Sequence, residues 1–208
     1  MLLESLFRRC LSIDYIRVGN DGDYACERIG NTLYLYFQGS NGAMDWKNNL
    51  DFPIKPYKRM DRGIWLVHRG FLRVWKSVEP YISPLIDDES IKEITIAGYS
   101  HGGALAVLCH EYVWYHREDL RKHLHGYGFG CPRVLWGILG NERHRWDNFT
   151  VVRNLNDLVT HLPPCFLGFR HVGEMMEIGA RGKYSMIDAH RSENIITELT
   201  ERTKRSYS

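Results

Sequence analysis

The chain lacks any long hydrophobic run and any marked excess of one charge. Its 208 residues contain no stretch approaching the roughly 20 apolar residues that a membrane-spanning helix needs. The 27 Lys and Arg residues nearly cancel the 25 Asp and Glu residues, so bulk charge does not favour nucleic acid or an anionic membrane. With only 7 prolines among its residues, the chain is not a low-complexity or collagen-like sequence. We therefore expect no nucleic-acid partner and no stable membrane insertion.

Cysteine is also scarce and scattered. The five cysteines form no Cys-x-x-Cys pair and no zinc-ligand spacing, and an odd number leaves one thiol outside any full set of disulfides. Residues 1–10 carry Glu4 among their leucines and contain no apolar run of signal-peptide length. These features predict reduced thiols and a cytoplasmic protein, with export by a non-standard route as the alternative.

Apolar residues recur with helical and strand spacing along the whole chain. Strands that alternate with helices predict an α/β fold with a largely parallel sheet. No internal repeat and no long polar linker divides the sequence, so we expect a single domain over residues 1–208. The expected helices cover residues 1–15, 70–86, 104–116 and 192–203, and the expected strands cover residues 24–29, 32–37, 64–67, 93–97, 127–129 and 149–153.

The most regular passage is a strand, a Gly-Tyr-Ser-His-Gly turn centred on Ser100, and a helix. A serine hydroxyl is a weak nucleophile until a base reaches it, so it must project from the end of a sheet on a sharp turn. A side chain at Gly98 or Gly102 would collide where the strand and the helix come together. The helix N-terminus also favours the negative charge that develops beside the serine. The pattern predicts a nucleophilic Ser100, and a glycine-rich turn without chemistry is the alternative.

The acid and the base of a catalytic triad are sought after the serine, in the chain order of α/β-hydrolases. Asp157 follows the expected strand 149–153, where a parallel sheet delivers side chains to the same edge as Ser100; a loop-capping aspartate is the alternative. Three histidines come later. His161 is too close along the chain to bridge comfortably, although it could line the pocket. His171 and His190 both remain candidates, and the free loop around His190 favours that residue.

Short segments in a fixed order then resemble one known family. They include Phe-Gln-Gly-Ser, Val-His-Arg-Gly-Phe, the serine turn with its doubled glycine, Phe-Gly-Cys-Pro-Arg-Val and Asp-Ala-His. Together they resemble the class 3 lipase family, the fungal-type triacylglycerol lipases of the α/β-hydrolase fold. The resembling segments lie at residues 37–40, 45–52, 67–71, 98–103, 129–134, 153–164, 169–173 and 188–190.

The resemblance implies roles for particular residues. It makes Ser100 the nucleophile, Asp157 the acid and His190 the base, and it leaves His171 as a structural residue near the pocket. The oxyanion hole that it implies uses the backbone N–H groups of Ser40 and His101. Residues 43–50 correspond to a short lid-like segment. We further expect substrate contacts from Trp46, Tyr99 and His161.

The resemblance also implies an activity. We expect a serine carboxylic-ester hydrolase that forms an acyl-enzyme on acylglycerols or other fatty-acyl esters and makes transient contact with a lipid interface. It needs no metal and no organic cofactor, and no oligomeric state follows from the sequence. Phospholipase A1, thioesterase or acyltransferase activity on the same triad is the nearest alternative. From a different class, the chain could be a non-catalytic binding module on a hydrolase scaffold.

Overall fold

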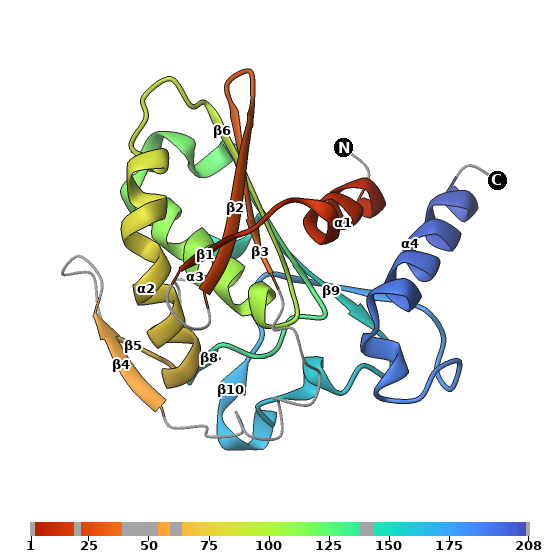
Figure 1. The fold of residues 1–208 in the computed structure, drawn as a ribbon. Coiled ribbons are helices and arrows are strands. Elements are labelled where there is room, and N and C mark those ends of the chain that lie inside the picture. The colour runs from red at the N-terminus through yellow and green to blue at the C-terminus, as the bar shows by residue number, and fades with distance from the viewer. Residues whose placement is uncertain (1–2, 19–21, 39–53, 59–63, 138–143, 207–208) are drawn as a thin grey trace.

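A computed structural model describes residues 3–18, 22–38, 54–58, 64–137 and 144–206 (Figure 1). The helices are α1 (Leu3–Ser12), α2 (Arg69–Ile86), α3 (His101–His116) and α4 (Ser192–Ser206), and the 3₁₀ turns used below are η2 (Glu118–His123), η4 (Val159–His161), η5 (Cys165–Leu167) and η6 (Asp188–His190). The strands are β1 (Ile16–Val18), β2 (Gly22–Ile29), β3 (Thr32–Phe37), β4 (Ile54–Lys58), β5 (Ile64–His68), β6 (Glu93–Tyr99), β7 (Leu124–Phe129), β8 (Leu135–Trp136), β9 (Phe149–Asn154), β10 (Phe169–Arg170) and β11 (Glu174–Ile178).

A seven-stranded sheet in the order β1-β2-β3-β6-β7-β9-β11 forms the centre of the fold. Within this sheet, β3, β6, β7, β9 and β11 run parallel to one another, and β1 and β2 extend one edge as antiparallel strands. Strand β6 is buried from Ile94 to Gly98, as expected for a parallel strand covered on both faces. The predicted α/β fold with a largely parallel sheet is confirmed.

Helices cover both faces of this sheet (Figure 1). On one face, α2 and α3 pack over the apolar side chains of β3 and β6. On the other face, α1 and α4 enclose a second cluster that includes Phe7, Phe129 and Val152. Helix α3 is buried around almost its whole circumference, which explains why its sequence is apolar on every side. This tight enclosure fixes the end of the helix that begins next to Ser100.

A smaller antiparallel sheet, in the order β10-β8-β5-β4, lies beside the first one. It leads directly into α2, because β5 ends at His68 and the helix begins at Arg69. The His68 ring caps that helix, since its Nδ1 accepts hydrogen bonds from the N–H groups of Gly70 at 3.1 Å and Phe71 at 3.4 Å. An imidazole thus replaces the usual Ser, Thr or Asp cap.

Several elements differ from the sequence-based expectation. Helix α2 does not differ in this way, because it runs through Pro80 and Pro84 and matches the expected helix 70–86 to within one residue. Strand β4 was not among the expected strands and includes Pro56. His171 lies between β10 and β11. The additional strands β1, β8 and β10 contain two or three residues each, too few for a recognisable alternating pattern.

Candidate active site

Ser100 occupies the sharp turn between β6 and α3. Its backbone adopts φ 55° and ψ −120°, a conformation that costs energy for any residue other than glycine. A Cβ atom built at Gly98 would lie 2.1 Å from the carbonyl oxygen of Gly102, and one built at Gly102 would lie 2.1 Å from that of Phe37. The two glycines therefore allow strand and helix to meet closely enough to hold the serine in this strained position.

Three side chains that are far apart in the sequence form a continuous hydrogen-bonded chain. Ser100 Oγ lies 2.8 Å from Nε2 of His190, and Nδ1 of His190 lies 2.8 Å from Oδ2 of Asp157. All three residues are buried, with exposed fractions of 5% for Ser100, 9% for His190 and 0% for Asp157. The structure thus brings together the serine, base and acid that the sequence predicted, in the relative order that proton transfer requires.

The carboxylate of Asp157 is held at both of its oxygens. Oδ2 accepts the hydrogen bond from His190, and Oδ1 accepts one from the backbone N–H of Val159 at 2.8 Å. The loop is closed further by Thr160, whose hydroxyl donates to the carbonyl oxygen of Asp157 at 2.8 Å. A carboxylate fixed in this way presents one defined oxygen to the imidazole and selects the tautomer with a proton on Nδ1.

Gly130 lies against both the acid and the base. Its backbone has φ +56°, and a Cβ atom there would lie 2.9 Å from Nδ1 of His190 and 3.1 Å from Oδ2 of Asp157. The residues alone did not single out this position. The signal was nonetheless present, because Gly130 belongs to the Phe-Gly-Cys-Pro-Arg-Val segment that resembles the family. Its missing side chain makes room for the His190–Asp157 pair.

A second contributor that the residues did not indicate is Asn154, the last residue of β9. Its buried side-chain amide donates to the carbonyl oxygen of Ala189 at 3.0 Å, next to His190. Asn154 also accepts the backbone N–H of Asp157 at 2.9 Å through its own carbonyl oxygen. One strand end therefore holds both the loop that carries the acid and the loop that carries the base.

His171, the competing candidate for the base, has a different place in the structure. Its Nε2–H donates to the carbonyl oxygen of Thr160 at 2.7 Å, so the ring supports the loop that carries the acid. Burial lowers the pKa of His171 to about 4, with a smaller opposing effect from that hydrogen bond. This buried imidazole contacts the loop that carries Asp157, and the imidazole that faces Ser100 is that of His190.

The expected oxyanion and substrate residues are only partly described. Ser40, Trp46 and the lid-like segment 43–50 lie outside the described residues. His101 is the first residue of α3, so its N–H belongs to the helix terminus that favours negative charge. His161 is exposed, and its carbonyl oxygen accepts a hydrogen bond from Arg133. Partial burial of the imidazole, together with the nearby charges of Arg153 and Arg133, lowers the pKa of His161.

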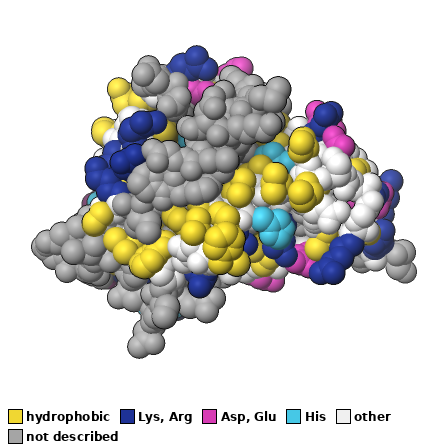
Figure 2. Space-filling view, turned by 90° about the horizontal axis from the view of Figure 1, so that it is seen from below, with side chains coloured by type: hydrophobic (Ala, Val, Ile, Leu, Met, Phe, Trp, Pro, Cys, Tyr) yellow, Lys and Arg dark blue, Asp and Glu magenta, His cyan; other side chains and the backbone are white. Residues whose placement is uncertain are grey.

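Large apolar side chains are exposed on the loops that carry the acid and the base. The two loops are linked by a hydrogen bond from the N–H of Leu158 to the carbonyl oxygen of Met186 at 3.2 Å. The lower face of the molecule shows hydrophobic side chains gathered around this region (Figure 2). The exposed side chains of the two loops are Leu158, Phe166, Leu167, Met186 and Ile187.

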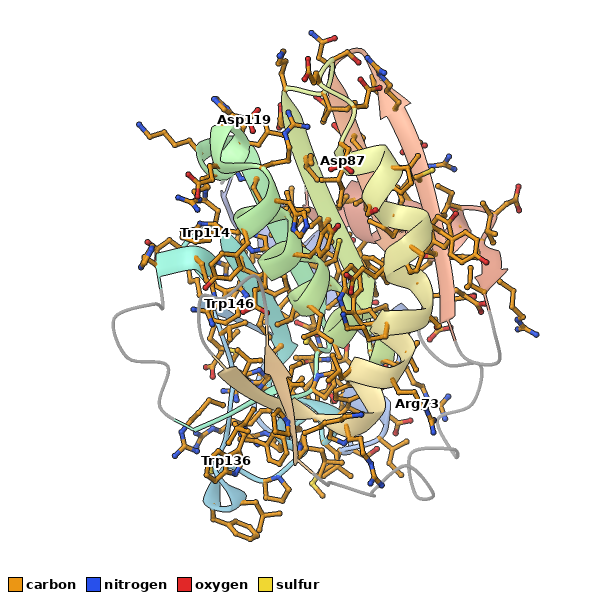
Figure 3. The ribbon with its side chains drawn as sticks, turned by 90° about the vertical axis from the view of Figure 1, so that its left-hand side faces the viewer. Arg73, Asp87, Trp114, Asp119, Trp136 and Trp146 are labelled. Atoms are coloured by element: carbon orange, nitrogen blue, oxygen red, sulfur yellow. The ribbon has the colours of Figure 1, made fainter. Side chains whose placement is uncertain are left out.

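A hollow lies at the opposite end of the sheet from Ser100. It has a volume of about 490 Å³, opens beside η2 and is lined mainly by polar residues, including Asp119. Figure 3 shows Asp119 at the far end of the molecule from Trp136, which belongs to the smaller sheet. Within the described part of the chain, no group of three or more His, Cys, Asp or Glu side chains is arranged to hold a metal ion.

Comparison with known proteins agrees with this geometry. The family model described as "Lipase (class 3)" matches residues 34–167, which is more than half of the chain. The chain belongs to the class 3 lipase family. The chain is 30% identical over 149 residues to a lipase of Rhizomucor miehei, a match that covers 69% of this chain and 40% of the relative. It therefore spans well under half the length of the curated relatives that it matches.

A solved structure extends the likeness to the fold. The chain superposes with a TM-score of 0.65 and 25% identity on a triacylglycerol lipase described as having a catalytic centre formed by a serine protease triad. That match covers 80% of this chain and 67% of the other. The resemblance to the class 3 lipase family seen in the sequence is therefore confirmed.

The expected cytoplasmic location is wrong according to the same comparisons. A relative from Malassezia globosa, named a secreted mono- and diacylglycerol lipase, is 30% identical over 137 residues, covering 58% of this chain and 40% of the relative. The scattered cysteines and the lack of an apolar run of signal-peptide length in residues 1–10 were therefore weak indicators of location. Among the helices that the structure describes, none is long and apolar enough to cross a membrane.

Proposed function

We propose that this class 3 lipase hydrolyses carboxylic esters of fatty acids, with acylglycerols as its substrate class, through an acyl-enzyme on Ser100. The observation that carries the proposal is the unbroken hydrogen-bonded chain from Ser100 through His190 to Asp157. The triacylglycerol lipase with a serine protease triad supports it, since that enzyme has the same fold.

The reaction follows from this geometry. His190 Nε2 accepts the Ser100 proton as Oγ forms a bond to the ester carbonyl carbon, and the carbonyl electrons move to oxygen. Asp157 stabilises the imidazolium that forms. The N–H groups of His101 and Ser40 are the donors proposed for the oxyanion. The carbon–oxygen bond to the alcohol then breaks, and His190 returns its proton to the leaving alkoxide.

Release of the acid repeats these steps with water. His190 takes a proton from water as the water oxygen attacks the acyl carbon, and the Ser100 oxygen then leaves with that proton. Each cycle therefore consumes one ester and one water and yields an alcohol and a carboxylic acid, with no net change in the enzyme.

The exposed apolar side chains around the site support a water-insoluble substrate. Phe166, in η5 after the acid, is 84% exposed, and Ile187, just before the turn that ends at His190, is 66% exposed. Exposed apolar area of this kind lowers the free energy of contact with a lipid surface. We infer that esters are taken from such a surface. We also infer an extracellular location, because the Malassezia relatives are named as secreted.

The decisive experiment treats the purified protein with a fluorophosphonate probe and maps the adduct by mass spectrometry. We expect a single adduct on Ser100 and none in Ser100→Ala, which should also lose at least about 10³-fold in kcat on p-nitrophenyl esters. Ser77→Ala is the matched control, because the Ser77 hydroxyl donates only to the Val74 carbonyl of its own helix. Undiminished turnover in Ser100→Ala would overturn the proposal.

A substrate panel then separates the neighbouring activities. Triolein and diolein emulsions, phosphatidylcholine vesicles, acyl-thioesters and soluble short-chain esters are compared at equal acyl concentration. The acylglycerol emulsions are expected to be turned over fastest. Faster cleavage of the phospholipid or the thioester would assign the triad to phospholipase or thioesterase chemistry, and turnover of soluble esters alone would exclude a lipase.

A further inference from the structure

Tyr99, the residue immediately before the nucleophile, touches the base at two points. Its hydroxyl donates a hydrogen bond to the backbone carbonyl oxygen of His190 at 2.6 Å. Its ring lies nearly parallel to the imidazole of His190, with 5.3 Å between ring centroids and 21° between the planes. Tyr99 was expected to contact substrate, but these contacts connect it to the catalytic machinery.

The Tyr99 side chain is itself held in place from behind. Its ring makes an edge contact with Phe7 of α1, with centroids 5.5 Å apart, and Phe7 in turn stacks on Phe129 at 4.4 Å. Burial raises the pKa of Tyr99, and the nearby Asp157 charge raises it further. The hydroxyl therefore keeps its proton and remains a donor throughout the pH range in which an esterase works.

The loop that carries His190 needs such outside support. His190 is the last residue of η6, a single turn of three residues. The backbone hydrogen bonds of this turn join residues close together in the sequence; for example, the N–H of His190 donates to the carbonyl oxygen of Ile187 at 3.1 Å. One hydrogen bond from β9 fixes Ala189, the residue before His190, because the side-chain amide of Asn154 donates to the Ala189 carbonyl oxygen. Tyr99 supplies a link to His190 itself, and it does so from the same turn that presents Ser100.

We propose that Tyr99 is a positioning residue that ties His190 to the nucleophile's own turn and supports the imidazolium formed during catalysis. The tie matters because a displacement of about 1 Å between reacting groups can lower the rate by two orders of magnitude. The ring matters because an aromatic face within about 6 Å of a cation attracts it. The inference rests on the proposed ester hydrolysis.

Two substitutions separate the two contacts. Tyr99→Phe removes the hydroxyl and keeps the ring, and we expect kcat to fall by about 3- to 10-fold, the usual range for one lost hydrogen bond. Tyr99→Leu removes both contacts, and we expect a fall of about 10- to 100-fold. In both variants KM should stay within about twofold of the wild type. The rate of reaction with the fluorophosphonate should fall in parallel with kcat.

Tyr127→Phe is the matched control. Tyr127 lies on β7 and pairs with Ala97, two residues before Tyr99, so it occupies the same face of the sheet. Among the described residues, no hydrogen bond and no ring contact joins Tyr127 to the triad. We expect unchanged kcat in that variant. Circular dichroism at the assay temperature establishes that each variant is folded.

Each outcome decides a separate question. A raised KM with unchanged kcat in Tyr99→Phe and Tyr99→Leu would make Tyr99 a substrate contact and overturn the inference. Unchanged kinetics in both folded variants would overturn it as well. If the wild type does not react with the probe at Ser100, the proposed function fails first, and this result is distinguishable because it appears before any Tyr99 variant is compared.

Discussion

His190 and His110 are two buried imidazoles in opposite circumstances. His190 has a partner at each ring nitrogen, Asp157 at Nδ1 and Ser100 at Nε2. His110, in the middle of α3, is 1% exposed, and neither of its ring nitrogens has a hydrogen-bond partner among the described residues. Its ring meets that of Phe149 edge-on, with centroids 5.3 Å apart.

The difference teaches what burial alone does to a histidine. At His110, burial lowers the pKa to about 3, and the charge of nearby His125 acts in the same direction. Such a ring stays neutral and can neither accept nor deliver a proton near neutral pH. His190 differs because both of its ring nitrogens have partners, and one of these partners is the carboxylate of Asp157, an anion. In the proposed reaction this carboxylate stabilises the imidazolium that forms.

Removing that anion should produce the largest effect. Asp157→Asn leaves the volume unchanged but replaces the acceptor oxygen with a group that can donate, which favours the wrong tautomer of His190. We expect kcat/KM to fall by about 10³- to 10⁴-fold on p-nitrophenyl esters while the thermal midpoint changes little. Asp147→Asn is the control, because exposed Asp147 precedes β9, and its activity should match the wild type. Retained activity in Asp157→Asn would remove the distinction between the two histidines.

Crowding His190 should have an intermediate effect. Gly130→Ala places a methyl group 2.9 Å from Nδ1 of His190 and also strains a backbone with φ +56°. We expect kcat to fall by about 10- to 100-fold because the ring must shift. Gly30→Ala is the control, since its φ of +61° is similar and no atom lies within 4 Å of the added carbon. Both variants should lose about 1 kcal/mol of stability, so equal kcat in both would contradict the role assigned to Gly130.

The smallest effect concerns acid stability and leaves activity unchanged. The imidazole of His110 takes up a proton near pH 6.5 when the chain is unfolded but only near pH 3 when it is folded. Between these values the unfolded state binds more protons, so stability falls as the pH falls through this window. His110→Leu removes this contribution. We expect its free energy of unfolding to drop less between pH 7 and pH 4, by on the order of 2–3 kcal/mol.

Chemical denaturation at both pH values measures this change. Exposed His123 provides the control, because His123→Gln should follow the wild-type curve. His171, whose pKa is lowered to about 4, contributes in the same direction and keeps part of the pH dependence in every variant. An unchanged pH dependence in His110→Leu would show that the imidazole at this position is not neutral when folded.

The fold class and the serine turn were predictable because their signals are local. Alternating strands and helices predict a parallel α/β sheet, and the glycines around Ser100 record a close approach of strand and helix that no side chain would permit. Strand β9 likewise indicated Asp157, because the position of a residue just past a parallel strand assigns it to one edge of the sheet.

The short strands were not predictable in this way, and the course of α2 through its prolines depends on packing as well. Strands β8 and β10 contain two residues each. They form because β8 pairs with β10 on one side and with β5 on the other. Helix α2 passes through Pro80 and Pro84 because its apolar face, which includes Val78 and Ile82, is buried against the core. In both cases tertiary packing outweighs the local preference.

The choice between His171 and His190 shows where sequence reasoning ended. Residue spacing left both open, the family resemblance favoured His190, and the structure places His190 at Ser100 and His171 behind the acid loop. Chain order cannot distinguish them, because both follow β9 in loops of undetermined path. The contacts of Tyr99 and Gly130 with His190, and of Asn154 with Ala189, were hidden for the same reason.

By itself, the sequence determined the periodicities that build a parallel sheet, the turn that exposes a serine, and the set of residues able to act as acid and base. Only the tertiary structure decided which of those residues meet. Local spacing constrains neighbours along the chain, whereas the meeting of Ser100, Asp157 and His190 depends on how β6, β9 and the loop before α4 are packed against one another. Packing joins residues that are 33 and 90 positions apart, and no pattern within one segment can encode such a distance.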